Sequence, residues 1–111
     1  MRTLGYHIIH WIQLIRFFRI KDATRIMWKL IMSSSNKMIE VATSSFHHGI
    51  RIRKGTSDVP IFHQVFCDLQ YDLTWYIKYH PKLIIDAGAN VGYGTLYFHH
   101  LYHQAQIWSI E

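Results

Sequence analysis

Two acidic residues and a glycine-rich turn form the part of the chain whose residue types and spacing best suit ligand chemistry. After Asp86, every second position holds glycine or asparagine: Gly88, Asn90 and Gly92. Glycine adopts positive φ values without a steric penalty, and asparagine tolerates them better than most residues do. The second acid, Glu111, follows another apolar run. A sharp turn flanked by two carboxylates can hold a flat ligand that carries a positive charge.

The residues around this turn predict one βαβ unit of an α/β fold. Residues 82–86 and 106–110 are short apolar runs, as in strands that are covered on both faces, and a helix is expected from the turn to about Tyr102. This order predicts a parallel strand pair with a right-handed crossover. The carboxyl ends of parallel strands share one sheet edge, where ligands bind in such folds. We therefore expect Asp86 and Glu111 to be neighbours, with the free amides of the helix directed at the same place.

Two common phosphate-binding patterns do not fit the turn. The dinucleotide pattern G-x-G-x-x-G, started at Gly88, meets Asn90 and Tyr93 where glycine is required, and no Lys-Ser or Lys-Thr follows as in a P-loop. A carboxylate in front of the turn repels phosphate but attracts a cation. These groups together fit S-adenosylmethionine. Asp86 can bind its ammonium group, the glycine backbone can lie against its nucleoside and Glu111 can bind its ribose diol.

The amino-acid sequence of this region resembles that of a known enzyme family. DAGANVGYGTLYF, followed by QIWSIE, is similar to the cofactor-binding start of class I S-adenosylmethionine-dependent methyltransferases, and more closely to that of the FkbM-type methyltransferases. Those proteins share D-x-G-A-N-x-G, a preceding TSD…F-x-Q-V-F element and a tyrosine before the strand. In this chain the TSD…F-x-Q-V-F element is formed by residues 56–58 and 61–66, and the tyrosine before the strand is Tyr71. Where relatives often have serine or threonine after Tyr93, this chain has Gly94.

The resemblance implies a fold, a cofactor and a reaction. The implied fold is Rossmann-like, with its first βαβ unit in residues 50–111 after a helical and hairpin extension over residues 1–49. S-adenosylmethionine is the implied cofactor, and the implied site residues are Asp86, Gly88, Asn90, Gly92 and, for the ribose, Glu111. The implied reaction is O-methyl transfer to a sugar or another small hydroxyl compound. Catalytic residues are expected after Glu111, so the chain is interpreted as an N-terminal fragment that is inactive alone.

The first part of the chain predicts two helices and a hairpin. An apolar stripe predicts one helix over residues 4–20, formed by Leu4, Ile8, Trp11, Ile15 and Phe18. Asp22 is expected to cap a second helix, whose buried face is predicted to be Ala23, Ile26, Met27, Leu30 and Ile31. Residues 37–42 and 50–54 predict two short strands joined by a turn at Gly49.

Two further helices are expected between the hairpin and the βαβ unit. Ser57 or Asp58 can accept hydrogen bonds from the free amides of the first, and Pro60 suits its first turn. Residues 73–80 predict the second, which Pro81 ends.

The charge distribution leaves two interpretations of the N-terminal half. Lysine and arginine outnumber aspartate and glutamate by 12 to 7, mostly before residue 55, which indicates either a solvated surface or an anionic partner. The uncharged stretch of residues 3–15 is too short to span a bilayer, so its helix packs on the protein or lies on a membrane surface. Nucleic acid is not an expected partner, because the aromatic residues are spread as in a core. The alternative function is a peripheral membrane or interaction module that uses this basic, aromatic helix.

Cysteine and histidine add little chemistry. Cys67 is the single cysteine, which favours a reducing, cytoplasmic location and a role as a small apolar residue. His99 and His103 are four residues apart on the predicted helix, but no nearby ligand completes a metal site, so none is predicted. The sequence makes no prediction of oligomeric state.

Overall fold

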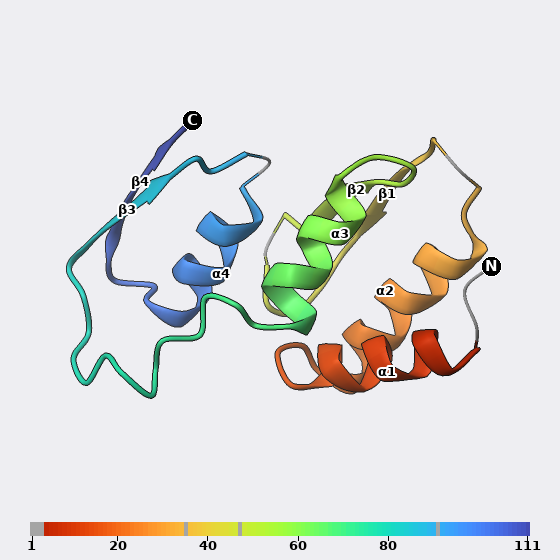
Figure 1. Ribbon diagram of the computed structural model, residues 1–111, viewed down its shortest axis with the longest axis horizontal. Helices are drawn as coiled ribbons and strands as arrows, with labels where there is room; N and C mark the ends of the chain where they lie inside the picture. Colours follow the sequence, from red (N-terminus) through yellow and green to blue (C-terminus); the bar gives the residue numbers. More distant parts are fainter. Residues whose placement is uncertain (1–3, 35, 47, 91) are drawn as a thin grey trace.

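The computed structural model describes residues 4–34, 36–46, 48–90 and 92–111. Within them the fold is mixed α/β, with four α-helices and two small sheets, one antiparallel and one parallel. Figure 1 shows the helices α1 and α2 next to the antiparallel sheet and α3, while β3, β4 and α4 form the other end of the molecule. The parallel pair and its helix are the unit that carries the candidate site.

The N-terminal helix is shorter than the sequence predicts. α1 spans Leu4–Ile15 and α2 spans Ile20–Met32, so the prediction of one helix over residues 4–20 is wrong. The chain turns between them because Phe17 and Phe18 both enter the core, where each contacts Phe46 and Phe66. Consecutive helical residues point about 100° apart, so an unbroken helix could not direct both rings into one core.

The apolar stripe expected on α1 is only partly packed against the protein. Leu4 is 75% exposed and Ile8 is 44% exposed, whereas Leu14 is fully buried. The packed side instead carries His10, whose ring stacks on that of His63 at 4.0 Å. α1 therefore leaves much of its apolar surface uncovered.

In α2 the predicted buried face is confirmed at Ala23, Ile26, Met27 and Leu30, but Ile31 is exposed. Asp22 does not cap the helix, contrary to prediction, since α2 begins two residues earlier. Its carboxylate accepts hydrogen bonds from the backbone N–H and hydroxyl of Ser44, at 2.9 and 2.7 Å. Asp22 thus ties α2 to the loop after the first strand.

The predicted hairpin is confirmed. β1 (Met38–Val41) pairs antiparallel with β2 (Ile50–Arg53), and alternate residues of both strands face the core. The buried residues are Ile39, Val41, Ile50 and Ile52. Because β1 and β2 lie on either side of residue 49, this sheet joins the expected N-terminal extension to the expected methyltransferase region.

A short helix follows the hairpin and widens into one π-helical turn. α3 spans Asp58–Phe62 with Pro60 in its first turn, as predicted, and the wider turn spans His63–Cys67. Ser57 makes no side-chain cap and Asp58 bonds to Arg53, so the predicted capping is wrong. This segment supplies the centre of the core, with Phe62, Val65, Phe66 and Cys67 buried.

The helix predicted over residues 73–80 does not form. This stretch has only turns, and Asp72 accepts hydrogen bonds from the backbone and hydroxyl of Thr74 in a local turn. Trp75, Tyr76 and Tyr79 are mostly exposed. A helix this short needs an apolar face packed on a partner, and these side chains have none among the described residues.

The predicted βαβ unit is confirmed. β3 (Leu83–Ala87) and β4 (Gln106–Ile110) are parallel, and α4 (Tyr93–Leu101) connects them. The expectation that the first strand is covered on both faces is wrong, because one face of the sheet is half exposed. The exposed residues of that face are Leu83, Ile85, Trp108 and Ile110.

Candidate functional site

The parallel register brings the two predicted acids to the same sheet edge. Asp86 pairs with Ser109 and Ala87 pairs with Ile110, so Glu111 is the next residue along β4. The backbone N–H of Gly88 and that of Ala89 both donate to the carbonyl of Ile110, at 2.6 and 3.0 Å. The glycine turn therefore begins directly beside Glu111, at the end of the blue strands in Figure 1.

The turn has the backbone geometry that its residue types predict. The φ angles are +73° at Gly88, +54° at Asn90 and +91° at Gly92. A hydrogen bond of 2.9 Å from the Gly92 N–H to the Ala89 carbonyl closes the turn. A Cβ atom at Gly88 or Gly92 would meet nothing within 4 Å. Glycine is thus required at these positions by the backbone angle, and the space beside both is open to a ligand.

Asp86 is held in place by the hydroxyl of Thr95, which in turn bonds to the hydroxyl of Ser109, and sequence reasoning missed both residues. The Thr95 hydroxyl donates to the Asp86 carboxylate at 2.7 Å and lies 2.6 Å from the hydroxyl of Ser109. Asp86 is 9% exposed, whereas Glu111 is exposed. The two acids therefore differ: one is oriented by β4 and α4, and the other extends into solvent.

Gly94 fits this arrangement because of its small size. α4 begins at Tyr93, so Gly94 lies within the helix. A Cβ atom at Gly94 would come within 3.1 Å of the Tyr71 ring and 3.4 Å of the Asp86 carboxylate. The Tyr71 ring also packs on Phe98, with centroids 5.4 Å apart. The tyrosine that precedes the strand thus covers the first turn of α4 next to the acid.

The charge of the two acids is not neutralised by a cation in the described part of the chain. The ion pairs there join Arg25 to Asp22, Arg51 to Glu40 and Arg53 to Asp58. None includes Asp86 or Glu111. A sheet edge with two carboxylates and no paired cation favours a ligand that brings a positive charge.

The TSD element stabilises structure rather than lining the site. The buried Asp58 carboxylate accepts hydrogen bonds from the Arg53 guanidinium at 2.9 and 3.1 Å and from its backbone N–H at 3.0 Å. Arg53 thereby lowers the pKa of Asp58 below its ordinary value. Thr56 accepts from the Asp58 N–H and donates to the Arg53 carbonyl. These bonds fix the turn between β2 and α3.

One buried tyrosine connects the site to that hairpin. The Tyr93 hydroxyl donates to the carbonyl of Arg51 at 2.6 Å, and its ring packs against Phe62 and Phe66. Burial raises the pKa of Tyr93, so its hydroxyl stays a donor. The start of α4, and with it the glycine turn, is therefore anchored on β2 and the core.

The remaining candidate residues do not form a reactive site. α4 ends at Leu101, so His103 does not continue the helical face of His99, and both are exposed. No group of three metal-ligating side chains occurs in residues 4–34, 36–46, 48–90 and 92–111. Cys67 is fully buried, and burial raises its pKa to about 12. A thiol in this state is an apolar core group and not a nucleophile.

Comparisons of the chain with protein-family models, with curated proteins and with solved structures found no match. A functional assignment therefore depends on the sequence motif around the turn and on the geometry of residues 86–111 described above.

Proposed function

We propose that residues 83–111 form the S-adenosylmethionine-binding start of a methyltransferase domain with a Rossmann-like fold. The observation that carries this proposal is the parallel register of β3 and β4, which puts a positive-φ turn between Asp86 and Glu111. The same residues carry the resemblance of the sequence to FkbM-type methyltransferases. An acid before the turn and another on the next strand suit a cationic nucleoside better than a nucleotide phosphate.

Each residue of the site has a role in this proposal. The backbone at Gly88, Asn90 and Gly92 lies against the nucleoside, since a Cβ atom at Gly88 or Gly92 would meet nothing within 4 Å. The Asp86 carboxylate, oriented by Thr95, faces the positively charged end of the cofactor. Glu111 accepts two hydrogen bonds from the ribose diol. The bound cofactor would supply an activated methyl group.

The reaction in this proposal is O-methyl transfer to a sugar or another small hydroxyl compound. Such transfer depends mainly on aligning the acceptor oxygen with the methyl group, sometimes with a general base. We assign no described residue to that role. The half-exposed face of Leu83, Ile85, Trp108 and Ile110 supports a site completed by further elements, because doubly wound sheets carry helices on both faces.

Calorimetric titration with S-adenosylhomocysteine tests the proposal. Wild-type protein should release or absorb heat with one-site binding, and Asp86→Ala and Glu111→Ala should each weaken binding at least about tenfold. Glu40→Ala, which removes an exposed acid from β1, is the matched control and should bind normally. Circular dichroism establishes that each variant is folded. A folded wild-type protein that gives no binding heat contradicts the proposal.

A second candidate function has one observation in its favour. α1 exposes an apolar surface formed by Leu4, Ile8, Ile9 and Ile12, which suits contact with a membrane surface. None of the described helices has the length and apolar character needed to cross a bilayer. Pelleting with anionic liposomes should fail for Ile8→Glu and Ile12→Glu but not for Ile85→Glu, which is exposed on the distant sheet. Equal pelleting of the wild-type protein and the three variants would exclude this surface of α1 as a membrane contact.

A further inference from the structure

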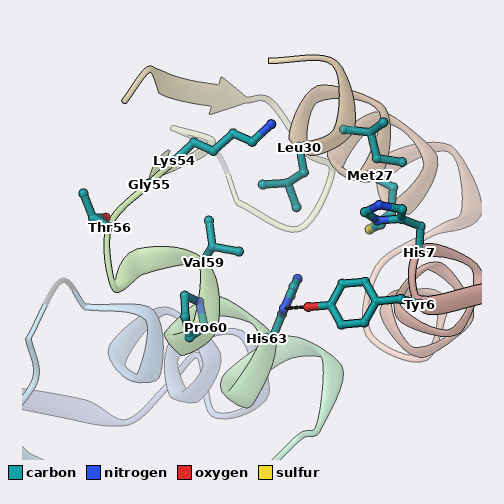
Figure 2. A pocket seen from close by; sticks show the side chains of 11 residues that line it. Tyr6, His7, Met27, Leu30, Lys54, Gly55, Thr56, Val59, Pro60 and His63 are labelled. Atoms are coloured by element: carbon teal, nitrogen blue, oxygen red, sulfur yellow. Dashed lines mark hydrogen bonds between the residues drawn. The ribbon is translucent and has the colours of Figure 1, made fainter. Parts of the chain in front are cut away.

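A cavity separate from the glycine turn lies between the first three helices. Its volume is about 750 Å³, within the usual range for small-molecule sites. Figure 2 shows it between α1, α2 and α3, with Lys54 and Gly55 on the turn that follows β2. None of the residues that the motif around Asp86 singles out lines it.

The walls of the cavity are mainly apolar. Met27 and Leu30 of α2 face Val59 and Pro60 of α3, and Figure 2 shows Leu30 and Val59 directed into the space from opposite sides. At the far end, the Tyr6 hydroxyl lies 3.5 Å from Nδ1 of His63. These surfaces suit the hydrocarbon part of a ligand, since burying apolar surface is favourable.

The polar lining has one sign of charge. Lys54 is half-buried at the rim, across the cavity from Tyr6 and His63, and no acidic residue is among the described residues that line the space. The Lys54 ammonium donates to the carbonyl of Ser33. An ammonium group has three N–H donors, so it can hold a carboxylate and keep this bond.

We propose that this cavity binds a small amphipathic carboxylate, with its carboxylate on Lys54 and its apolar chain between Leu30 and Val59. A neutral apolar ligand would cover part of the half-buried Lys54 ammonium without supplying a counter-charge, which is unfavourable. A carboxylate with a hydrocarbon chain can pair with the Lys54 ammonium and also pack against the apolar side chains of the lining. The inference is independent of the proposed cofactor site, because the two share no lining residue.

Calorimetric titration with decanoate tests the inference, with decanol as a ligand of equal chain length and no charge. Wild-type protein should bind decanoate at least about tenfold more tightly than decanol, because only decanoate forms the charge-assisted bond. Lys54→Met should remove this preference. Lys29→Met is the matched control, since Lys29 also donates to a backbone carbonyl, that of Glu40, but lies outside the cavity. Asp86→Ala should bind decanoate normally.

A second measurement locates the bound ligand in the wild-type protein. In wild-type protein with labelled methyl groups, decanoate should shift the NMR signals of Leu30 and Val59 and leave that of Ile110 unchanged. Val59→Trp, which puts a bulky ring into the part of the cavity proposed for the apolar chain, should weaken binding. The inference is overturned if decanoate does not bind, if Lys54→Met binds it as Lys29→Met does, or if the shifts fall outside the cavity.

Discussion

The hydroxyl of Thr95 donates to the carboxylate of Asp86 over 2.7 Å and lies 2.6 Å from the hydroxyl of Ser109. One threonine thereby connects the end of β3, the first turn of α4 and the end of β4. The orientation of Asp86 is set before any ligand arrives. Preorganisation of this kind raises affinity because less side-chain freedom is lost on binding.

Thr95→Val should weaken both the fold and the proposed site. It removes the hydroxyl at nearly constant volume and leaves a largely buried carboxylate without this partner, at a cost of about 1–2 kcal/mol in the free energy of unfolding. Urea denaturation measures this loss, and titration with S-adenosylhomocysteine should show weaker binding. Thr95→Ser keeps the hydroxyl and serves as control. Thr95→Val binding as tightly as Thr95→Ser would show that the hydroxyl does not prepare Asp86.

Gly94→Ala should not give the stabilisation that this change normally gives inside a helix, about 1 kcal/mol. The new methyl group would lie 3.1 Å from the Tyr71 ring, so the ring must move. In a Tyr71→Ala background the obstacle is absent, and Gly94→Ala should then stabilise α4. A double-mutant cycle by thermal unfolding measures this coupling. Equal effects of Gly94→Ala in both backgrounds would rule out the contact.

Asp58→Asn should lower the stability of the fold at neutral pH. The variant should also lose less stability than the wild type as the pH falls. The Arg53 guanidinium holds the pKa of Asp58 below its ordinary value of 3.8, so the ionised carboxylate stabilises the fold at all pH values above that. This contribution is lost as the pH falls through the lowered pKa, and the gap between wild type and variant should narrow below about pH 4. Urea midpoints across this range measure it, with exposed Asp68→Asn as control. A difference in urea midpoint between wild type and Asp58→Asn that stays constant with pH would contradict this role of the Asp58 carboxylate.

Cys67 should react slowly with a thiol reagent in the folded protein. Burial raises its pKa from 9.0 to about 12, which reduces the thiolate fraction at pH 8 by about a thousandfold. The rate of reaction with 5,5′-dithiobis(2-nitrobenzoate) should therefore rise by at least about that factor in 6 M guanidinium chloride, about the concentration that unfolds stable domains. Rapid labelling of the folded protein would show that Cys67 is accessible.

The elements that were predicted correctly are those whose signal is local. The βαβ unit follows from two apolar runs and a glycine turn, and the positive φ angles of Gly88 and Gly92 follow from their residue type. The hairpin follows from strict alternation in residues 50–53. In each case the residues that decide the structure are neighbours in the sequence.

The wrong predictions depend on contacts between distant residues. The break after Ile15 forms because two phenylalanines enter one core, and Asp22 bonds to Ser44, 22 residues away. The helix over residues 73–80 is absent because nothing among the described residues covers its aromatic side chains. The hydrogen bonds that join Thr95 to Asp86 and to Ser109 depend on the exact register of β3 and β4, which the predicted order of elements does not specify.

NMR titration of the ¹⁵N-labelled protein with S-adenosylhomocysteine tests most directly whether the turn after β3 is the cofactor site. The account predicts shifts in the backbone amide signals of Gly88, Gly92 and Glu111, while those of Gly49 and Gly55, in distant turns, stay in place. Shifts that spare the turn, or a spectrum of folded protein that does not change at all, would contradict it.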